Sequence, residues 1–184
     1  TVEEAAAQRG VSPMTAFLDL AIASDLELFF IQAAANHDQN LVLELMRQKN
    51  AIPTFSDSGA HVSQIMDSSL QTHMLGHWVR NEGAFTIEDA VHRMTQMPAR
   101  AWGFGDRGVL ATGMAADINI FDLSAVTPDL PELLYDLPGG ARRLRQTASG
   151  FKATLVNGEV LVEDGTPTGT TPGRLLRGPL AQRT

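Results

Sequence analysis

The sequence predicts an α/β protein whose C-terminal part is built from β-strands. In residues 1–101, segments with apolar residues at helical spacing alternate with short apolar runs. This alternation is the pattern of a parallel sheet covered by helices. After Trp102, glycine and proline become frequent and short strand patterns replace the helical ones. We therefore expect two parts, residues 1–101 and residues 102–184.

Two helices and two strands are expected at the start of the chain. The first helix, over residues 12–26, has Ser12 as its cap and Pro13 at its first position. The second helix begins after Asp38, which can cap it. The full set, in chain order, is a helix over 12–26, a buried strand over 27–34, a helix over about 39–49 and a strand over 51–56.

Two further helices complete the α/β part. One is expected over residues 63–82, with a break near Gly76 as an alternative. The other covers residues 86–101, where Thr86 and Asp89 fit the capping-box pattern.

The β part has one hairpin signal and two short strand patterns. Asn157-Gly158 separates the apolar runs 153–156 and 159–163, and Asn-Gly between such runs predicts a tight hairpin. Strands are also expected over 108–111 and 117–122, and the tail from Gly165 is expected to run extended. Gly103, Gly105 and Gly108 match G-x-G-x-x-G, but they follow a helix and precede a strand, so a turn explains them better than a dinucleotide site.

Composition excludes several classes of function. The net charge of −7 argues against nucleic-acid binding and against docking on an anionic membrane. The absence of cysteine excludes a disulfide scaffold, a thiolate zinc site and a cysteine nucleophile within this chain. No apolar run is long enough to span a membrane, and no signal peptide is visible, although the chain begins at Thr1 rather than Met. We expect a cytoplasmic protein.

The stretch "TFSDSGAH" contains the main candidate for chemistry. Asp57 follows an apolar run, and polar groups at the carboxyl ends of strands face the ligand-binding edge of an α/β sheet. His61 lies four residues further on and can reach the same edge. The alternative is that Asp57 only caps the helix that follows.

Two other pairs of polar residues have structural explanations that we prefer. His73 and His77 have the spacing of a helical metal pair, but the residue after His73 is Met74 instead of the glutamate of zinc proteases. Arg80 and Arg142 can pair with a substrate carboxylate, or they are ordinary surface charges.

Several of these segments together resemble the amidohydrolase superfamily, and within it the N-acyl-D-amino-acid deacylase group. The resemblance covers nearly the whole chain. It is carried by "FSDSGAH", by "TIEDAVHRMTQMPARAWGFGDRGVLATGMAADINIFD", by "DLPGGARRL" and by "VNGEVLVEDGTPTGTTPGRLLR". The second of these resembles the superfamily's exit from its barrel, and the last two resemble the deacylase group more narrowly.

The resemblance implies a fold and an activity. The family has a (β/α)₈ TIM barrel and a small β-sandwich, so residues 1–101 would be the C-terminal part of the barrel and residues 102–184 part of the sandwich. The family hydrolyses the amide of N-acyl-D-amino acids with bound zinc, and its substrate is a small molecule. Asp57 would carry the proton from the attacking water to the leaving nitrogen and would also contact the metal. His61 is a candidate for contact with the substrate on the basis of its position four residues after Asp57 alone.

The resemblance also shows what this chain lacks. None of its five histidines lies in a His-x-His pair, so the family's other zinc ligands lie outside these residues. A full barrel takes about 250 residues, more than the whole chain, so we expect the rest of the enzyme or a partner chain to accompany it. Two alternatives stay open: a truncated chain that serves only as a structural or oligomerising module, including a homo-oligomer, and an amidohydrolase acting on cyclic amides.

Overall fold

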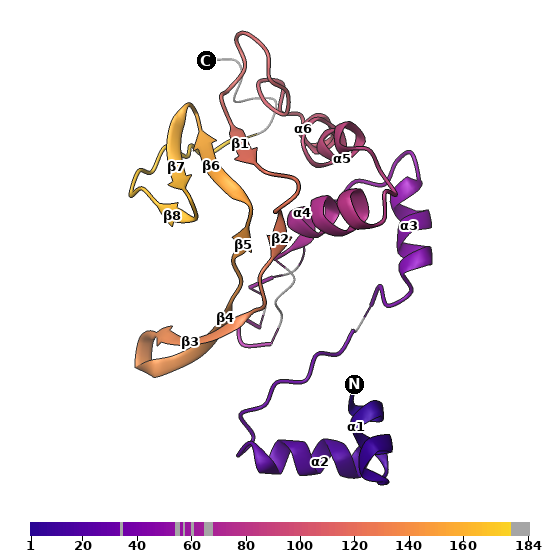
Figure 1. Ribbon diagram of the computed structural model, residues 1–184. Coiled ribbons are helices and arrows are strands. Elements are labelled where there is room, and N and C mark those ends of the chain that lie inside the picture. Colours follow the sequence, from indigo (N-terminus) through magenta and orange to yellow (C-terminus); the bar gives the residue numbers. More distant parts are fainter. Residues whose placement is uncertain (34, 54–55, 57, 60, 65–67, 178–184) are drawn as a thin grey trace. The chain divides into compact units, whose positions relative to one another are not determined.

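The computed structural model describes residues 1–33, 35–53, 56, 58–59, 61–64 and 68–177. The chain forms two compact units, Thr1–Val42 and Leu43–Thr184. Helices and strands are both present, as the α/β prediction requires (Figure 1).

The first unit contains two capped helices, α1 (Val2–Arg9) and α2 (Pro13–Ala23). Ser12 Oγ accepts a hydrogen bond from Thr15 N at 3.1 Å, which confirms the predicted cap of α2. The helix ends at Ala23, before the predicted residue 26, because the chain turns through positive φ values of 51° and 62° at Asp25 and Leu26. Small buried side chains from the two helices, Ala6 and Ala16, form the packed part of this unit.

The two strands predicted in the α/β part are not found. Residues 27–33 form no strand, and the predicted buried side chain of Ile31 is 93% exposed. Residues 51–53 and 56 are also outside any strand, and the remaining positions of 51–56 lie outside the described residues. A strand needs a neighbour to satisfy its backbone N–H and C=O groups. The described part of residues 1–101 provides none for these segments.

The helix between these segments is confirmed as α3 (Gln39–Arg47). Asp38 Oδ1 accepts hydrogen bonds from Asn40 N at 3.0 Å and Leu41 N at 3.3 Å, so the predicted cap is also confirmed.

The next helical segment begins later than the sequence predicts. It consists of α4 (Leu70–His73) followed directly by the π-helix η1 (Met74–Asn81). Residues 61–64 and 68–69 are turns, which excludes a helix that begins at residue 63. Gly76 causes no break, because it lies inside η1.

The helix predicted over residues 86–101 divides in two, α5 (Ile87–Met94) and α6 (Gln96–Ala101). Thr86 Oγ1 accepts from Asp89 N at 3.2 Å, which confirms the start of α5. The division falls at Thr95, whose φ and ψ are −124° and −77°. Pro98 explains it, because a proline has no N–H and its ring collides with the carbonyl four residues earlier, that of Met94.

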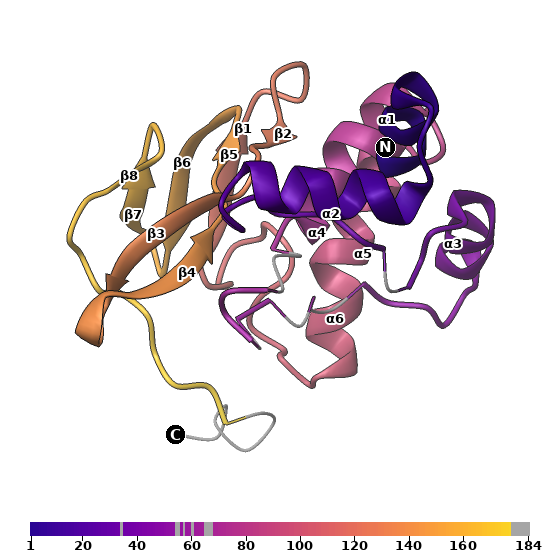
Figure 2. The same cartoon turned by 90° about the horizontal axis from the view of Figure 1, so that it is seen from below.

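The main sheet of the second unit is antiparallel, with strand order β1-β6-β7-β8 (Figure 2). Its strands are β1 (Ile118–Phe121), β6 (Phe151–Val156), β7 (Glu159–Glu163) and β8 (Thr166–Pro167). The predicted hairpin is confirmed: Val156 pairs with Glu159 across the turn. Asn157 and Gly158 have φ values of 50° and 83°, as a type I′ turn requires.

Two smaller strand pairs were not predicted. They are β2 (Thr127–Pro128) with β5 (Ala148–Ser149), and β3 (Glu132–Leu137) with β4 (Ala141–Arg145). The strand predicted over 108–111 is wrong. A Cβ on Gly108 would lie 2.7 Å from Ala99 Cβ, so this segment is a tight turn against α6. The glycines of the G-x-G-x-x-G match therefore lie in turns, as expected.

The backbone of Val126 is held between two glycines. Val126 has a fully buried side chain. A Cβ on Gly150 would lie 2.5 Å from Val126 N, and a Cβ on Gly76 would lie 2.9 Å from Val126 O. The π-helix and the link between β5 and β6 thus meet the same residue from two sides.

None of the described helices has the length and apolar character needed to cross a membrane.

We predict that Gly150→Ala destabilises the chain by about 2–4 kcal/mol, because the new methyl group meets the Val126 backbone and φ is +88°. Urea unfolding followed by circular dichroism measures this. Gly165→Ala is the matched control: its φ is +76° but no atom lies within 4 Å, so only backbone strain of about 1 kcal/mol is expected. An equal fall in the free energy of unfolding for the two variants would show that the close contact with Val126 does not contribute to stability.

Candidate active-site loop

The predicted catalytic residue, Asp57, lies outside the described residues, and only its neighbours are placed. Ser56 Oγ accepts a hydrogen bond from Ser58 N at 3.4 Å, and Gly59 has a φ of 89°. The next described helix begins at Leu70 with Ser69 as its cap. Residues 58–59, 61–64 and 68–69 are turns, so the helix that Asp57 would alternatively cap is not found among the described residues before Leu70.

His61 occupies a strained turn. Its φ is 49°, which is uncommon for a residue other than glycine, and its carbonyl accepts from Gln64 N at 2.7 Å. Its side chain is exposed. Backbone strain of this kind is often retained at functional sites. The substrate contact assigned to His61 stays a prediction.

The β3–β4 hairpin is joined to this loop. Leu144 N, on β4, donates a hydrogen bond to Val62 O at 2.9 Å. The segment "DLPGGARRL" therefore adjoins the loop that carries His61. Sequence reasoning missed this hairpin, although Pro138-Gly139-Gly140 between two runs of opposite charge was a usable signal.

Cross-strand ion pairs fix the register of this hairpin. Arg143 donates two hydrogen bonds to the Asp136 carboxylate, both 2.7 Å, and Arg145 pairs with Glu132. Hydrogen bonds from Arg143 hold the pKa of Asp136 below its ordinary value. Arg142 also lies on β4 and is exposed; its proposed pairing with a substrate carboxylate stays a prediction.

His73 and His77 stack on each other at the start of the π-helix. Their ring centroids lie 4.6 Å apart with 22° between the planes, and Trp78 meets the ring of His77 edge-on at 4.6 Å. Partial burial, and to a smaller extent the charge of His77, hold the pKa of His73 below its ordinary value. Nearly parallel rings direct their in-plane nitrogen lone pairs side by side and away from a common point, so the pair is arranged for stacking.

Arg80 has a structural role. Its Nη1 donates to three carbonyl oxygens: Leu123 O at 3.2 Å, Ser124 O at 3.3 Å and Val126 O at 2.5 Å. Neither the substrate-carboxylate role nor the surface-charge role considered from the sequence describes it. A guanidinium is well suited to this contact because it carries several donors in a fixed plane.

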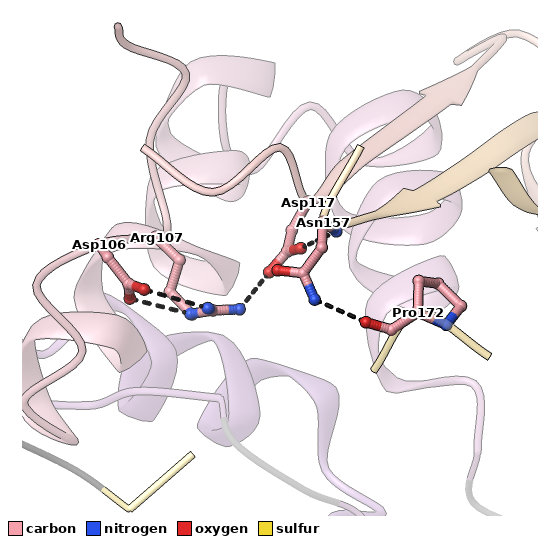
Figure 3. Close-up of polar contacts among 5 residues, drawn as sticks. All are labelled: Asp106, Arg107, Asp117, Asn157 and Pro172. Carbon is pink, nitrogen blue, oxygen red and sulfur yellow. Dashed lines mark hydrogen bonds and ion pairs between the residues drawn. The ribbon is translucent and has the colours of Figure 1, made fainter. Parts of the chain in front are cut away.

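A second polar cluster joins the turn after α6 to the main sheet (Figure 3). Arg107 pairs with Asp106 and donates through Nη1 to Asp117 Oδ2 at 2.5 Å. Asp117 Oδ1 accepts from Asn157 N at 2.9 Å, and Asn157 Nδ2 donates to Pro172 O at 2.7 Å. The bonds from Arg107 hold the pKa of Asp106 below its ordinary value. This cluster connects structural elements and has no nucleophile or free base among its members.

The described residues do not form a metal site by themselves. Nowhere among them do three or more histidine or acidic side chains come close enough to hold an ion. Asp57, the metal ligand that the resemblance assigns to this chain, lies outside the described residues.

Comparison with known proteins gives a consistent result. The profile described as "Amidohydrolase family" matches residues 1–162. The N-acyl-D-glutamate deacylase of Alcaligenes xylosoxydans xylosoxydans is 38% identical over 106 residues, which is 58% of this chain and 20% of that protein.

Two solved structures are also similar. A D-aminoacylase variant studied with copper chloride matches 95% of this chain and 34% of its own, with a TM-score of 0.56 and 28% identity. The N-acyl-D-glutamate deacylase of Bordetella bronchiseptica, complexed with zinc and a phosphonate mimic of the tetrahedral intermediate, matches 90% and 33%, with a TM-score of 0.53 and 28% identity. The chain thus spans about a third of these structures and a fifth of the curated relative.

We predict that Arg80→Ala destabilises the chain by about 2–4 kcal/mol, because it leaves the buried Val126 carbonyl without its charged donor. Arg145→Ala is the control: its ion pair with Glu132 is half exposed, so a loss below about 1 kcal/mol is expected. Urea unfolding measures both. A loss for Arg80→Ala no greater than that of the control would contradict the structural role.

We also predict that acid destabilises the chain through His73. A folded-state pKa below the ordinary value of about 6.5 means that the unfolded chain binds more protons once the pH falls through that value. Stability should therefore fall as the pH is lowered from 7 toward the folded-state pKa and then level off. In His73→Gln this part of the slope should disappear, whereas His92→Gln, an exposed site on α5, should keep it. Unfolding curves collected at several pH values test this, and identical slopes in wild type and His73→Gln would refute it.

Proposed function

The chain belongs to the amidohydrolase family, and on that premise we propose that it is the C-terminal portion of a zinc-dependent N-acyl-D-amino-acid deacylase. Such an enzyme hydrolyses the amide bond of its substrate to a carboxylate and a free D-amino acid. The likeness to N-acyl-D-glutamate deacylase over more than half of the chain carries this proposal. The deacylase and D-aminoacylase structures, which cover most of the chain, support it.

Asp57 is the catalytic residue that we propose. A carboxylate at the attacking water can take its proton, and the same group can then protonate the leaving nitrogen. This transfer matters because an amine leaves poorly unless it is protonated. His61, four residues further along the same loop, is proposed to contact the substrate.

Zinc is proposed as the cofactor, with most of its ligands outside residues 1–184. Zinc acts as a Lewis acid in such hydrolases. Asp57 is the ligand that this chain would contribute. The metal complexes of the two similar structures support a metal-dependent reaction.

The proposed architecture assigns residues 1–101 to the C-terminal part of a TIM barrel and residues 102–184 to part of a β-sandwich. Large apolar side chains are exposed in both parts, among them Ile31 at 93% and Leu130 at 86%. Extensive exposed apolar surface is typical of a face that another segment covers. We propose that the rest of the enzyme covers it, and that residues 27–34 and 51–56 become strands only against that partner.

The decisive experiment is Asp57→Asn in the enzyme that contains this chain and the complementary barrel. We predict a fall in kcat of about 10²–10⁴ with N-acyl-D-amino acids, since the variant keeps the shape of the side chain but accepts no proton. Asp38→Asn is the control, because asparagine caps a helix as well as aspartate does. Near-normal turnover by Asp57→Asn would exclude the assigned role.

Cyclic amides serve as the competing substrates in the same assay. Turnover of cyclic amides without turnover of N-acyl-D-amino acids would move the protein to another branch of the family. Absence of any activity in the assembled enzyme would favour a structural or oligomerising module.

A further inference from the structure

The turn between β6 and β7 holds a chemically labile pair of residues, Asn157-Gly158. In an Asn-Gly pair the backbone nitrogen of glycine can attack Cγ of the preceding side chain, because glycine has no side chain to obstruct it. The new N–C bond closes a succinimide ring and the side-chain nitrogen leaves as ammonia. Water then opens the ring to aspartate or isoaspartate. No oxidant, reductant or further reactant is needed.

Hydrogen bonds hold both reacting groups of this pair. The attacking atom, Gly158 N, donates to Ala116 O at 3.0 Å. The leaving nitrogen, Asn157 Nδ2, donates to Pro172 O at 2.7 Å (Figure 3). Asn157 N donates to Asp117 Oδ1 at 2.9 Å, which fixes the backbone of the turn. Attack requires the side chain to rotate away from Pro172, so the contact with Pro172 opposes the reaction.

Pro172 belongs to a C-terminal strap, which we define as residues 168–177. The strap follows β8 and lies beyond residue 162, where the family match ends. Its first part is held to β7 by hydroxyl groups: Thr168 Oγ1 and Thr170 Oγ1 donate to Val160 O at 2.7 and 2.9 Å. Further along, the bond from Asn157 Nδ2 to Pro172 O is the last hydrogen bond found between the described part of the strap and the β6–β7 hairpin.

We propose that Asn157-Gly158 is a deamidation site controlled by the strap, and that its conversion to aspartate or isoaspartate releases the strap from Pro172 onward. The hydrogen bond from Asn157 to Pro172 affects both the reaction and the position of the strap. While the strap is docked, it holds the amide and slows the reaction. Once the amide is lost, the strap has no donor to bind.

The negative charge of the product prevents the strap from binding again at residue 157. The amide that donates to Pro172 O is replaced by a carboxylate, which has no proton to donate at neutral pH and faces a carbonyl oxygen. The new negative charge also lies on the residue whose backbone is bonded to the Asp117 carboxylate. Arg107, the cation of this cluster, is already paired with Asp106 and Asp117. An isoaspartate would in addition lengthen the backbone of a two-residue turn that depends on its φ values.

Peptide mapping by mass spectrometry tests the first half of the proposal. The full chain and a chain that ends at Thr171 are aged in mildly alkaline buffer, and conversion of each asparagine is followed through the mass change from amide to carboxyl. We expect conversion at Asn157 in both, and roughly fivefold faster in the shorter chain, which is the effect of losing one hydrogen bond. Asn119, exposed on β1 and followed by Ile120, is the internal control and should stay unconverted.

Limited trypsin digestion tests the second half. Cleavage after Arg174, within the strap, should be severalfold faster in Asn157→Asp than in wild type. Asn119→Asp adds the same charge to the same sheet and should leave the rate unchanged. Asn157→Gly keeps a turn of Gly-Gly type, removes the donor and adds no charge, so it should release the strap without a folding defect.

Two results would overturn the proposal. Equal conversion rates at Asn157 in the full and shortened chains would show that the strap does not control the reaction. Wild-type cleavage rates after Arg174 in both Asn157→Asp and Asn157→Gly would show that the amide does not hold the strap.

Discussion

The second unit depends on the close approach of three segments at the backbone of Val126. Gly76 and Gly150 leave room on either side for this residue, and Arg80 binds its carbonyl. The constraint is steric at Val126 N and both steric and electrostatic at Val126 O, so each partner has a specific chemical requirement. Glycine is needed where backbone meets backbone, and a charged donor is needed where a carbonyl is taken out of water. These contacts hold the π-helix, the segment before β2 and the start of β6 against one another.

The candidate active-site loop is linked to this structure through the β3–β4 hairpin. Leu144 N donates a hydrogen bond to the carbonyl of Val62, the residue that follows His61. The hairpin itself is stiffened by two Arg–carboxylate pairs across its strands. A reaction that depends on one carboxylate needs its loop held in place. The loop proposed to carry Asp57 is therefore anchored at Val62 by a backbone hydrogen bond, which leaves its side chains free of that structural task.

Local signals in the sequence were accurate where a few adjacent residues decide the conformation. The caps Ser12, Asp38 and Thr86 all bind the backbone N–H groups that their positions predict. The Asn157-Gly158 turn forms because both residues accept positive φ values. The strands expected at 27–34 and 51–56 failed, because a strand is completed by hydrogen bonds to a neighbour that need not be close in sequence. Asp57 was found from its position after an apolar run, and the structure leaves that residue undescribed.

The sequence by itself determined the family and the candidate acid, together with the capped helices and the tight hairpin, since these depend on residue identity and short-range geometry. It did not reveal that Arg80 binds three carbonyls, that Gly76 admits the Val126 backbone, or that Asn157 holds Pro172. Each of these contacts joins residues that lie between 15 and 50 positions apart. Only the tertiary structure decides them, because hydrogen bonding and steric exclusion act over a few ångströms in space, whatever the separation along the chain.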